Sequence, residues 1–233
     1  MGRKVYVITA TVGTPELEQC MDSVQLQDYV EGEIEHIIVC DGKEVDVSSR
    51  PVTKLVLPWN TGRDRFICHK IYAAVPHLLH GEDSLVMFLD EDNWIEPNHI
   101  SSLVKVIECG KVWAFALRNV CGKDGRFICK DACESLGHLG PTWLNPNDYL
   151  VDTSCYMVPV KVVRSFSECW QRRAREQPEA DRLFYRELSR HFPVFGCSYL
   201  YTVNYRLEGR EDSVTEEFFR LGNEAKNNLN SLS

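Results

Sequence analysis

The segment Ser84-Leu-Val-Met-Phe-Leu-Asp-Glu-Asp92 decides the fold, because it joins a strand to a pair of aspartates. Its short apolar run is flanked by charged residues on both sides, which is typical of a buried strand. Asp90 and Asp92 follow that strand at once, one residue apart. Carboxylates at a rigid strand end suit Mg²⁺ or Mn²⁺ and leave coordination positions for phosphate oxygens. We therefore predict that Asp90 and Asp92 bind a divalent metal.

Apolar runs alternate with amphipathic stretches on the N-terminal side of this segment and shortly beyond it. We expect strands at residues 5–9, 35–40, 52–57 and 84–89, and helices after Thr14, from near Arg63 and after Pro97. Parallel neighbours in a sheet require crossover connections between them. This order therefore predicts an α/β fold with a mostly parallel sheet flanked by helices.

The pattern changes after residue 110. We expect strands at 112–119 and 199–207, part of a hairpin at 125–130, helices near 160–173 and 179–190, and an irregular loop at 131–149 rich in Gly, Pro and Asn. A long irregular segment inside a compact domain is usually functional or mobile. We predict one domain at residues 1–210, followed by a helical tail at 211–233.

The composition of the 233 residues excludes several classes of protein. A formal net charge of −8 argues against a nucleic-acid partner, because such binding needs a basic surface that neutralises phosphates. No apolar run approaches the roughly 20 residues that a membrane-spanning helix needs. The N-terminus also lacks the apolar region and cleavage site of a signal peptide. We therefore expect a cytoplasmic protein without a membrane span.

The ten cysteines are predicted to be reduced thiols, several of them in the core. Disulfide frameworks belong to short secreted chains, whereas Cys20 and Cys40 lie in apolar runs. A zinc site is the alternative for a second group of side chains, Cys121, Cys129, Cys133 and His138. Their spacing lacks the tight Cys-x₂-Cys pairs of structural zinc sites, so we do not favour it.

Polar residues follow three of the expected strands, where ligands of open parallel sheets bind. They are Thr9 to Thr11, Asp41-Gly42 and Asp90 to Asp92. Four short motifs in this region occur in order: Ser23-Val-Gln-Leu-Gln-Asp-Tyr29, Val39-Cys-Asp-Gly42, Asn60-Thr-Gly62 and Asp90-Glu-Asp92 followed by Pro97. This series resembles the inverting nucleotide-sugar glycosyltransferases of the GT-A fold, especially glycosyltransferase family 2. The resemblance covers residues 4 to about 110.

The resemblance implies a metal-dependent glycosyltransferase that moves a sugar from a nucleotide-diphosphate sugar to a hydroxyl acceptor, such as a glycan, with inversion. Residues 1–110 would then form a donor-binding half and 111–210 an acceptor half. Asp90 and Asp92 would bind Mn²⁺ or Mg²⁺. The donor nucleotide-sugar would contact Thr9, Thr11, Asp41, Gly42, Arg63, Arg65 and Glu91. The family's alanine-arginine pair after Asn-x-Gly is absent from this chain.

A general base is also implied, as a carboxylate late in the chain at the start of a helix. Asp181 in Glu179-Ala-Asp181 fits that position. Asp152 is the alternative, because a carboxylate flanked by apolar residues is suited to accept a proton. The loop residues expected to contact the acceptor are Asp131, Glu134, His138 and Trp143.

Two other functions remain open at this point. A catalytically degenerate module that binds a sugar-nucleotide or a glycan would keep the fold and lose turnover. A sugar-phosphate nucleotidyltransferase is disfavoured, because its first loop is expected to be rich in Gly and to carry Arg or Lys. The corresponding segment, Thr9 to Pro15, has one glycine and no basic residue.

Overall fold

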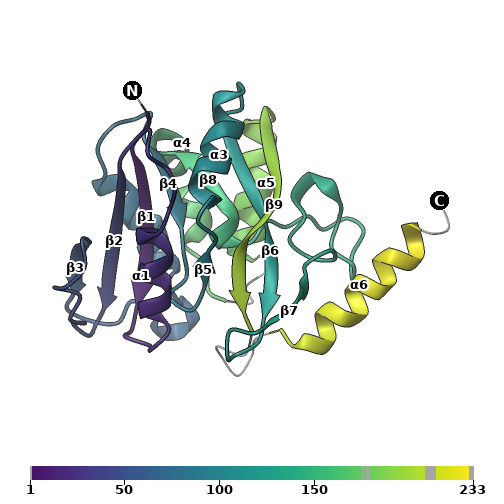
Figure 1. The fold of residues 1–233 in the computed structure, drawn as a ribbon, viewed down its shortest axis with the longest axis horizontal. Helices are drawn as coiled ribbons and strands as arrows, with labels where there is room; N and C mark the ends of the chain where they lie inside the picture. Colours follow the sequence, from purple (N-terminus) through teal and green to yellow (C-terminus); the bar gives the residue numbers. More distant parts are fainter. Residues whose placement is uncertain (1, 175, 177–178, 208–213, 231–233) are drawn as a thin grey trace.

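The computed structural model of the chain describes residues 2–174, 176, 179–207 and 214–230. Nine strands form one sheet in the order β3-β2-β1-β4-β8-β6-β9-β5, with β7 paired to β6. Figure 1 shows the helices α1 and α3 in front of this sheet and α4 and α5 behind it. The helix α6 projects to one side of the sheet, beyond β6 and β7. No helix among the described residues combines the length and the apolar character needed to cross a membrane.

The N-terminal part of the sheet is parallel, as predicted. Its elements are β1 (Val5–Thr11), α1 (Leu17–Gln25), β2 (Ile34–Asp41), β3 (Thr53–Leu57), α2 (His69–Ala74), β4 (Leu85–Phe88) and α3 (His99–Glu108). In this part β1 lies between β2 and β4, and β3 lies beyond β2, all in parallel register. The carboxyl ends of β1, β2 and β4 therefore meet at one edge.

The C-terminal part makes the sheet mixed rather than mostly parallel. Its elements are β5 (Trp94–Ile95), β6 (Trp113–Cys121), β7 (Phe127–Lys130), β8 (Tyr156–Pro159), α4 (Val160–Ser165), α5 (Ala180–His191), β9 (Phe195–Arg206) and α6 (Glu216–Asn230). Only β6 and β9 pair in parallel here, whereas β8 runs antiparallel to both β4 and β6. The prediction missed β8, because this strand has only four residues and α4 follows it at once.

Two predicted helix starts are wrong. The helix expected from near Arg63 begins at His69, and Arg63–Arg65 forms a 3₁₀ turn instead. Within and beside that turn, Asp64, Arg65 and Ile67 have positive φ angles of 57°, 69° and 55°. Residues other than glycine seldom adopt such angles, so a regular α-helix cannot continue through this segment. The first helix likewise begins at Leu17, after Glu16, rather than after Thr14.

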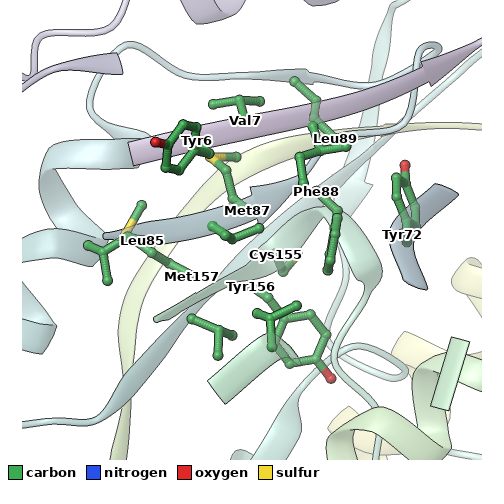
Figure 2. Packing of buried hydrophobic residues seen from close by; sticks show 14 of the residues in the cluster. Tyr6, Val7, Tyr72, Leu85, Met87, Phe88, Leu89, Cys155, Tyr156 and Met157 are labelled. Carbon is green, nitrogen blue, oxygen red and sulfur yellow. The ribbon is translucent and has the colours of Figure 1, made fainter. Parts of the chain in front are cut away.

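The largest core cluster extends through both parts of the sheet, and one part of it lies where β1 and β4 pack against α2 and the segment around Trp170. The rings of Tyr72 and Phe88 are 4.5 Å apart between centroids, and Trp170 lies 5.4 Å from Phe88. Figure 2 shows Tyr72 standing beside Phe88, with Tyr156 of β8 below them. All four side chains are buried. This packing fixes β4 rigidly just before the three acidic residues that follow it.

A smaller core cluster holds α6 against the C-terminal part of the sheet. Phe219 of α6 is fully buried with Val120, Cys133 and Leu207. The helix expected in the tail is thus present from Glu216, while the domain boundary predicted near residue 210 lies outside the described residues.

Gly222 allows α6 to approach the loop beneath it, and we expect Gly222→Val to loosen this contact. A Cβ atom at position 222 would lie 2.6 Å from Cys133 Sγ and 2.8 Å from Trp143 Cδ1. Overpacking of this kind typically costs about 1–3 kcal/mol. For a chain of this size that corresponds to a fall in Tm of about 2–12 °C, measured by thermal unfolding. Asn227→Val, at an exposed position of the same helix, is the control; equal Tm values for the two variants would refute the contact.

Candidate functional site

The carboxyl ends of β1, β2 and β4 border a cavity of about 370 Å³, here called the first cavity. Four predicted site residues line it together with Thr11: Asp41, Asp90, Glu91 and Asp92. They come from three strand ends that are far apart in the sequence and adjacent in the sheet. This cavity thus lies at the edge where open parallel sheets bind their ligands.

The Asp90 carboxylate is held by the core behind it. The Tyr72 hydroxyl donates a hydrogen bond of 2.7 Å to Asp90 Oδ1. Burial, reinforced by the Asp90 charge, raises the pKa of Tyr72 well above its ordinary value, so Tyr72 remains a donor at any physiological pH. The Asp90 backbone N–H also faces Ser154 Oγ at 3.3 Å. One acidic residue of the cavity is thus oriented by the aromatic cluster around Phe88.

Glu91 shapes the cavity wall rather than standing free in it. Its carboxylate accepts hydrogen bonds from the Thr11 hydroxyl and, at 3.2 Å each, from the backbone N–H groups of Val12 and Thr14. These contacts tie the loop after β1 to the end of β4. Thr11 and Glu91 therefore line the first cavity as a bonded pair.

Asp41 lies at the cavity with its carboxylate already engaged. It accepts hydrogen bonds from the backbone N–H groups of Thr61 at 2.7 Å and Gly62 at 3.1 Å. Gly42 has a φ of +81°, and a Cβ there would lie 2.2 Å from the Asn60 nitrogen. Gly42 is thus needed for the close approach of the 60–62 segment and does not itself line the cavity.

The structure does not support a donor contact for Thr9. Its side chain is fully buried, with the hydroxyl 3.0 Å from His36 Nε2 and 3.7 Å from Cys20 Sγ. Burial lowers the pKa of His36 to about 3, so this imidazole is neutral. Thr9 lies one strand repeat before the cavity and is covered by α1. Of the two threonines predicted on β1, only Thr11 lines the cavity.

Arg63 and Arg65 are exposed and line neither this cavity nor the second one described below. The structure therefore gives no support to their predicted contact with the donor. The cationic residues that line the first cavity are instead Lys123 and Arg206. Arg206 is buried and donates to the carbonyl of Asp92 at 2.9 Å and to that of Lys123 at 2.7 Å. A third hydrogen bond, of 2.5 Å, reaches the Gln19 side chain.

A second cavity of about 330 Å³ adjoins the first, and Ile67, Cys68 and Asp90 line both. Its other acidic residues are Glu134, Asp152, Glu179 and Asp181. Both residues proposed as general base therefore face the space next to the Asp-x-Asp motif. Asp90 stands at the boundary between the two cavities.

Asp181 occupies the first turn of α5, as predicted from its place before a helical stretch. Its side chain keeps 29% of its surface exposed, toward the second cavity that it lines. Burial raises the pKa of Asp181 to about 6, and the Arg182 guanidinium limits that rise. A carboxylate with such a pKa is ionised at neutral pH and basic enough to accept a proton.

Asp152 stands in an ion-pair network rather than in the apolar surroundings expected from its neighbours in sequence. Arg118 donates to Asp152 Oδ2 at 2.5 Å and to Asp131 Oδ2 at 2.8 Å. The Arg118 guanidinium also stacks 4.4 Å from the ring centre of Tyr205 and 5.4 Å from that of Phe219. Asp152 thus reaches the second cavity while bound to a buried cation.

The prediction that Asp131 contacts an acceptor is wrong. Its side chain is fully buried and accepts hydrogen bonds from the backbone N–H groups of Cys133, Glu134 and Ser135. Burial favours a higher pKa for Asp131, but the Arg118 charge and these N–H groups outweigh it and lower the pKa below its ordinary value. Asp131 is therefore the anchor of the loop that starts there.

The other loop residues divide between two places. Glu134 lines the second cavity, where Arg182 donates to it at 2.9 Å, and burial raises its pKa. Trp143 packs under α6 against Phe218, with ring centroids 5.4 Å apart, and lines neither cavity. His138 borders a separate cleft between this loop and α5.

The carboxylates at the first cavity are suitable ligands for a divalent cation that also binds phosphate oxygens. Asp90 and Asp92 both line this cavity. Within the described ranges, no group of three or more His, Cys, Asp or Glu side chains is arranged to hold a metal alone. Mg²⁺ in particular often takes one or two carboxylates and completes its shell with water and substrate phosphates.

Comparison with known proteins identifies solved structures with a similar fold. No protein-family model and no curated protein matches the sequence. Among solved structures, the chain is similar to residues 1–349 of S. aureus TarS in complex with UDP-GlcNAc, with a TM-score of 0.66 and 15% identity over 94% of this chain and 64% of that one. The UDP complex gives 0.64 and 14% over 96% and 64%, and a further structure of the fragment gives 0.62 and 16% over 87% and 60%.

This likeness shows that the chain has the GT-A fold of nucleotide-sugar glycosyltransferases. The chain spans less than two thirds of the length of the TarS fragment that it matches. At 14–16% identity, the likeness concerns the fold alone.

Proposed function

We propose that this chain is a glycosyltransferase that transfers a sugar from a UDP-sugar to a hydroxyl group of an acceptor such as a glycan. The observation that carries the proposal is the pair of adjoining cavities that share Asp90. One cavity has the Asp-x-Asp carboxylates and the other has Asp181, a carboxylate with a raised pKa. TarS, which shares the fold, has been crystallised with UDP-GlcNAc and with UDP, which supports UDP as the donor nucleotide.

The nucleotide would occupy the first cavity, with its diphosphate at Asp90 and Asp92. A divalent cation held by these two carboxylates would neutralise the diphosphate and stabilise it as a leaving group. Thr11 and Asp41 would border the nucleoside, held in place by Glu91 and by the N–H groups of the 60–62 segment. The donor sugar would then lie near Asp90, at the opening into the second cavity.

The acceptor would enter the second cavity with its hydroxyl beside Asp181. The acceptor oxygen attacks the anomeric carbon, its proton passes to the Asp181 carboxylate, and the bond from the anomeric carbon to the diphosphate oxygen breaks. Attack from the side opposite the leaving group inverts the configuration of the anomeric carbon. Glu134 and Asp152 line the same space and would contact acceptor hydroxyls.

Asp92→Ala is expected to remove metal-dependent nucleotide binding. A ligand at 100 times its dissociation constant stabilises a protein by about 2.7 kcal/mol, which for this chain length raises Tm by about 5–10 °C. We expect UDP with Mn²⁺ to give this rise in the unmutated protein and none in Asp92→Ala. Thermal unfolding across UDP, ADP and GDP, with Mn²⁺ and with a chelator, measures it.

Asp28→Ala is the matched control, because Asp28 is exposed and lines neither cavity. An Asp92→Ala protein that kept the full rise in Tm would refute the metal assignment. Binding of UDP without transfer to any acceptor or to water would favour a sugar-nucleotide-binding module over an enzyme. If transfer occurs, NMR of the new glycosidic bond distinguishes inversion from retention.

A further inference from the structure

The first cavity holds more negative than positive charge, although its proposed ligand is an anion. Its carboxylates belong to Glu16, Asp41, Asp90, Glu91 and Asp92. Among the described lining residues, the only cationic side chains are those of Lys123 and Arg206. The cationic side chains that line this cavity would therefore offset the repulsion between its carboxylates and a nucleoside diphosphate, in addition to any metal ion.

The Arg206 guanidinium already makes hydrogen bonds within the protein. Its Nε, Nη1 and Nη2 atoms donate to the Asp92 carbonyl, the Lys123 carbonyl and the Gln19 side chain. Its guanidinium also lies 4.8 Å from the ring centre of Trp94. The side chain is buried, so these contacts would have to be exchanged before Arg206 could bind a phosphate.

Lys123 is in the opposite situation, with a fixed backbone and an exposed side chain. It lies in the hairpin between β6 and β7, whose turn is closed by Gly122 N–H donating to Arg126 O at 2.8 Å. The hydrogen bond from Arg206 to the Lys123 carbonyl fixes the hairpin beside the Asp92 backbone, since the same guanidinium binds both. The backbone of Lys123 is thus held at the Asp-x-Asp end of the cavity, while its side chain is exposed.

We infer that Lys123 binds the diphosphate of the donor from the side of the β6–β7 hairpin. This inference rests on the proposed function and adds a residue from the acceptor half to the donor site. An ammonium is a compact charge on a flexible stem, which suits phosphate oxygens at the open side of the cavity. The location beside the Asp92 backbone favours the diphosphate over the nucleoside.

The test compares UDP with uridine, which lacks the phosphates. Calorimetric titration in Mn²⁺ is performed on the unmutated protein and on Lys123→Met, Lys123→Arg and Arg126→Met. Arg126 is exposed in the same hairpin and lines neither cavity, so Arg126→Met removes the same charge without touching the site. We expect Lys123→Met to weaken UDP binding about tenfold or more, because a hydrogen bond to a charged group contributes about 1.5–3 kcal/mol.

We expect Lys123→Met to bind uridine as tightly as the unmutated protein does. Lys123→Arg should retain most of the UDP affinity. Arg126→Met should bind UDP as the unmutated protein does. Equal UDP affinity in Lys123→Met and the unmutated protein would overturn the inference, as would equal weakening by Lys123→Met and Arg126→Met. If the unmutated protein binds none of UDP, ADP and GDP, the proposed function itself fails and the inference fails with it.

Discussion

Asp181→Asn is expected to lower the rate of sugar transfer by about 10²–10⁴-fold while leaving UDP binding unchanged, because general base catalysis contributes that much. Asparagine preserves the shape of the side chain and cannot accept the proton of the acceptor hydroxyl. Asp181 lines the second cavity and not the first, so the nucleotide keeps its contacts. Initial rates at saturating donor, together with UDP titration, measure the two effects separately.

The pH dependence of transfer follows from the pKa of Asp181. The carboxylate must be ionised to act as a base, so the rate should rise as the pH increases through about 6 and level off above it. Burial raises this pKa from 3.8, so the folded state holds the proton more tightly than the unfolded state does. The stability that comes from this protonation is present in acid and is lost as the pH rises through about 6. Asp181→Asn should therefore not lower Tm at pH 7.5.

Asp152→Asn distinguishes the two candidate bases. If Asp181 is the base, Asp152→Asn keeps most of the transfer rate at saturating acceptor, apart from any loss of folded protein that Tm reports. If Asp181→Asn keeps full activity while Asp152→Asn is folded and inactive, Asp152 is the general base instead of Asp181.

Arg118→Met is expected to cost about 3–5 kcal/mol of folding free energy, because it leaves two carboxylates without their cation. Asp131 is fully buried and Asp152 nearly so, and Arg118 bonds to both. At about 2–4 °C per kcal/mol, the Tm should fall by about 6–20 °C. Thermal and urea unfolding of the two proteins measure the difference.

The effect of Arg118→Met should also depend on pH. The pKa of Asp131 is lowered in the folded state, so its ion pair adds stability above the ordinary value of 3.8 and loses it as the pH falls below that value. The two proteins should therefore differ most near neutral pH and converge in acid. Arg50→Met is the control, since it removes a surface arginine paired with Glu18 and Asp22 and should cost no more than about 1 kcal/mol. A similar loss from both variants would contradict a special role for the Arg118 network.

The parts of the candidate site whose place in the fold follows from the sequence are those set by local structure. Asp41 and the Asp90–Asp92 segment follow apolar strands, and Asp181 opens a helix, so each position can be read from its neighbours in the chain. Thr9 shows the limit of this reasoning. Thr9 and Thr11 lie on the same side of β1, and whether a threonine meets the ligand depends on how far α1 extends over the strand. That coverage involves Cys20 and His36, which come from other elements.

The missed residues depend on pairing between distant strands. Cys121 of β6 lies opposite Arg206 of β9, and this register brings Lys123 and Arg206 together across 83 positions of sequence. No local pattern encodes such a register. Arg118 does carry a signal, since it is a charged residue within the apolar stretch predicted as strand 112–119 and therefore needs a buried partner. The loop rich in Gly, Pro and Asn gave no comparable signal, so Asp131 and Trp143 could not be told apart from residues that face a cavity.

The position of β9 has a consequence for how the protein is made. Among the described strands, β5 pairs only with β9. The residues of β9 that pair with β5 are synthesised more than 100 positions after it. The parallel strands β1 to β4 have all been synthesised by then, but a domain generally folds as a unit. The cation that joins the Asp92 loop to the hairpin, Arg206, is the last residue of β9. A nascent chain stalled before Arg206 should therefore fail to retain a nucleoside diphosphate, even though its whole Asp-x-Asp motif has already emerged.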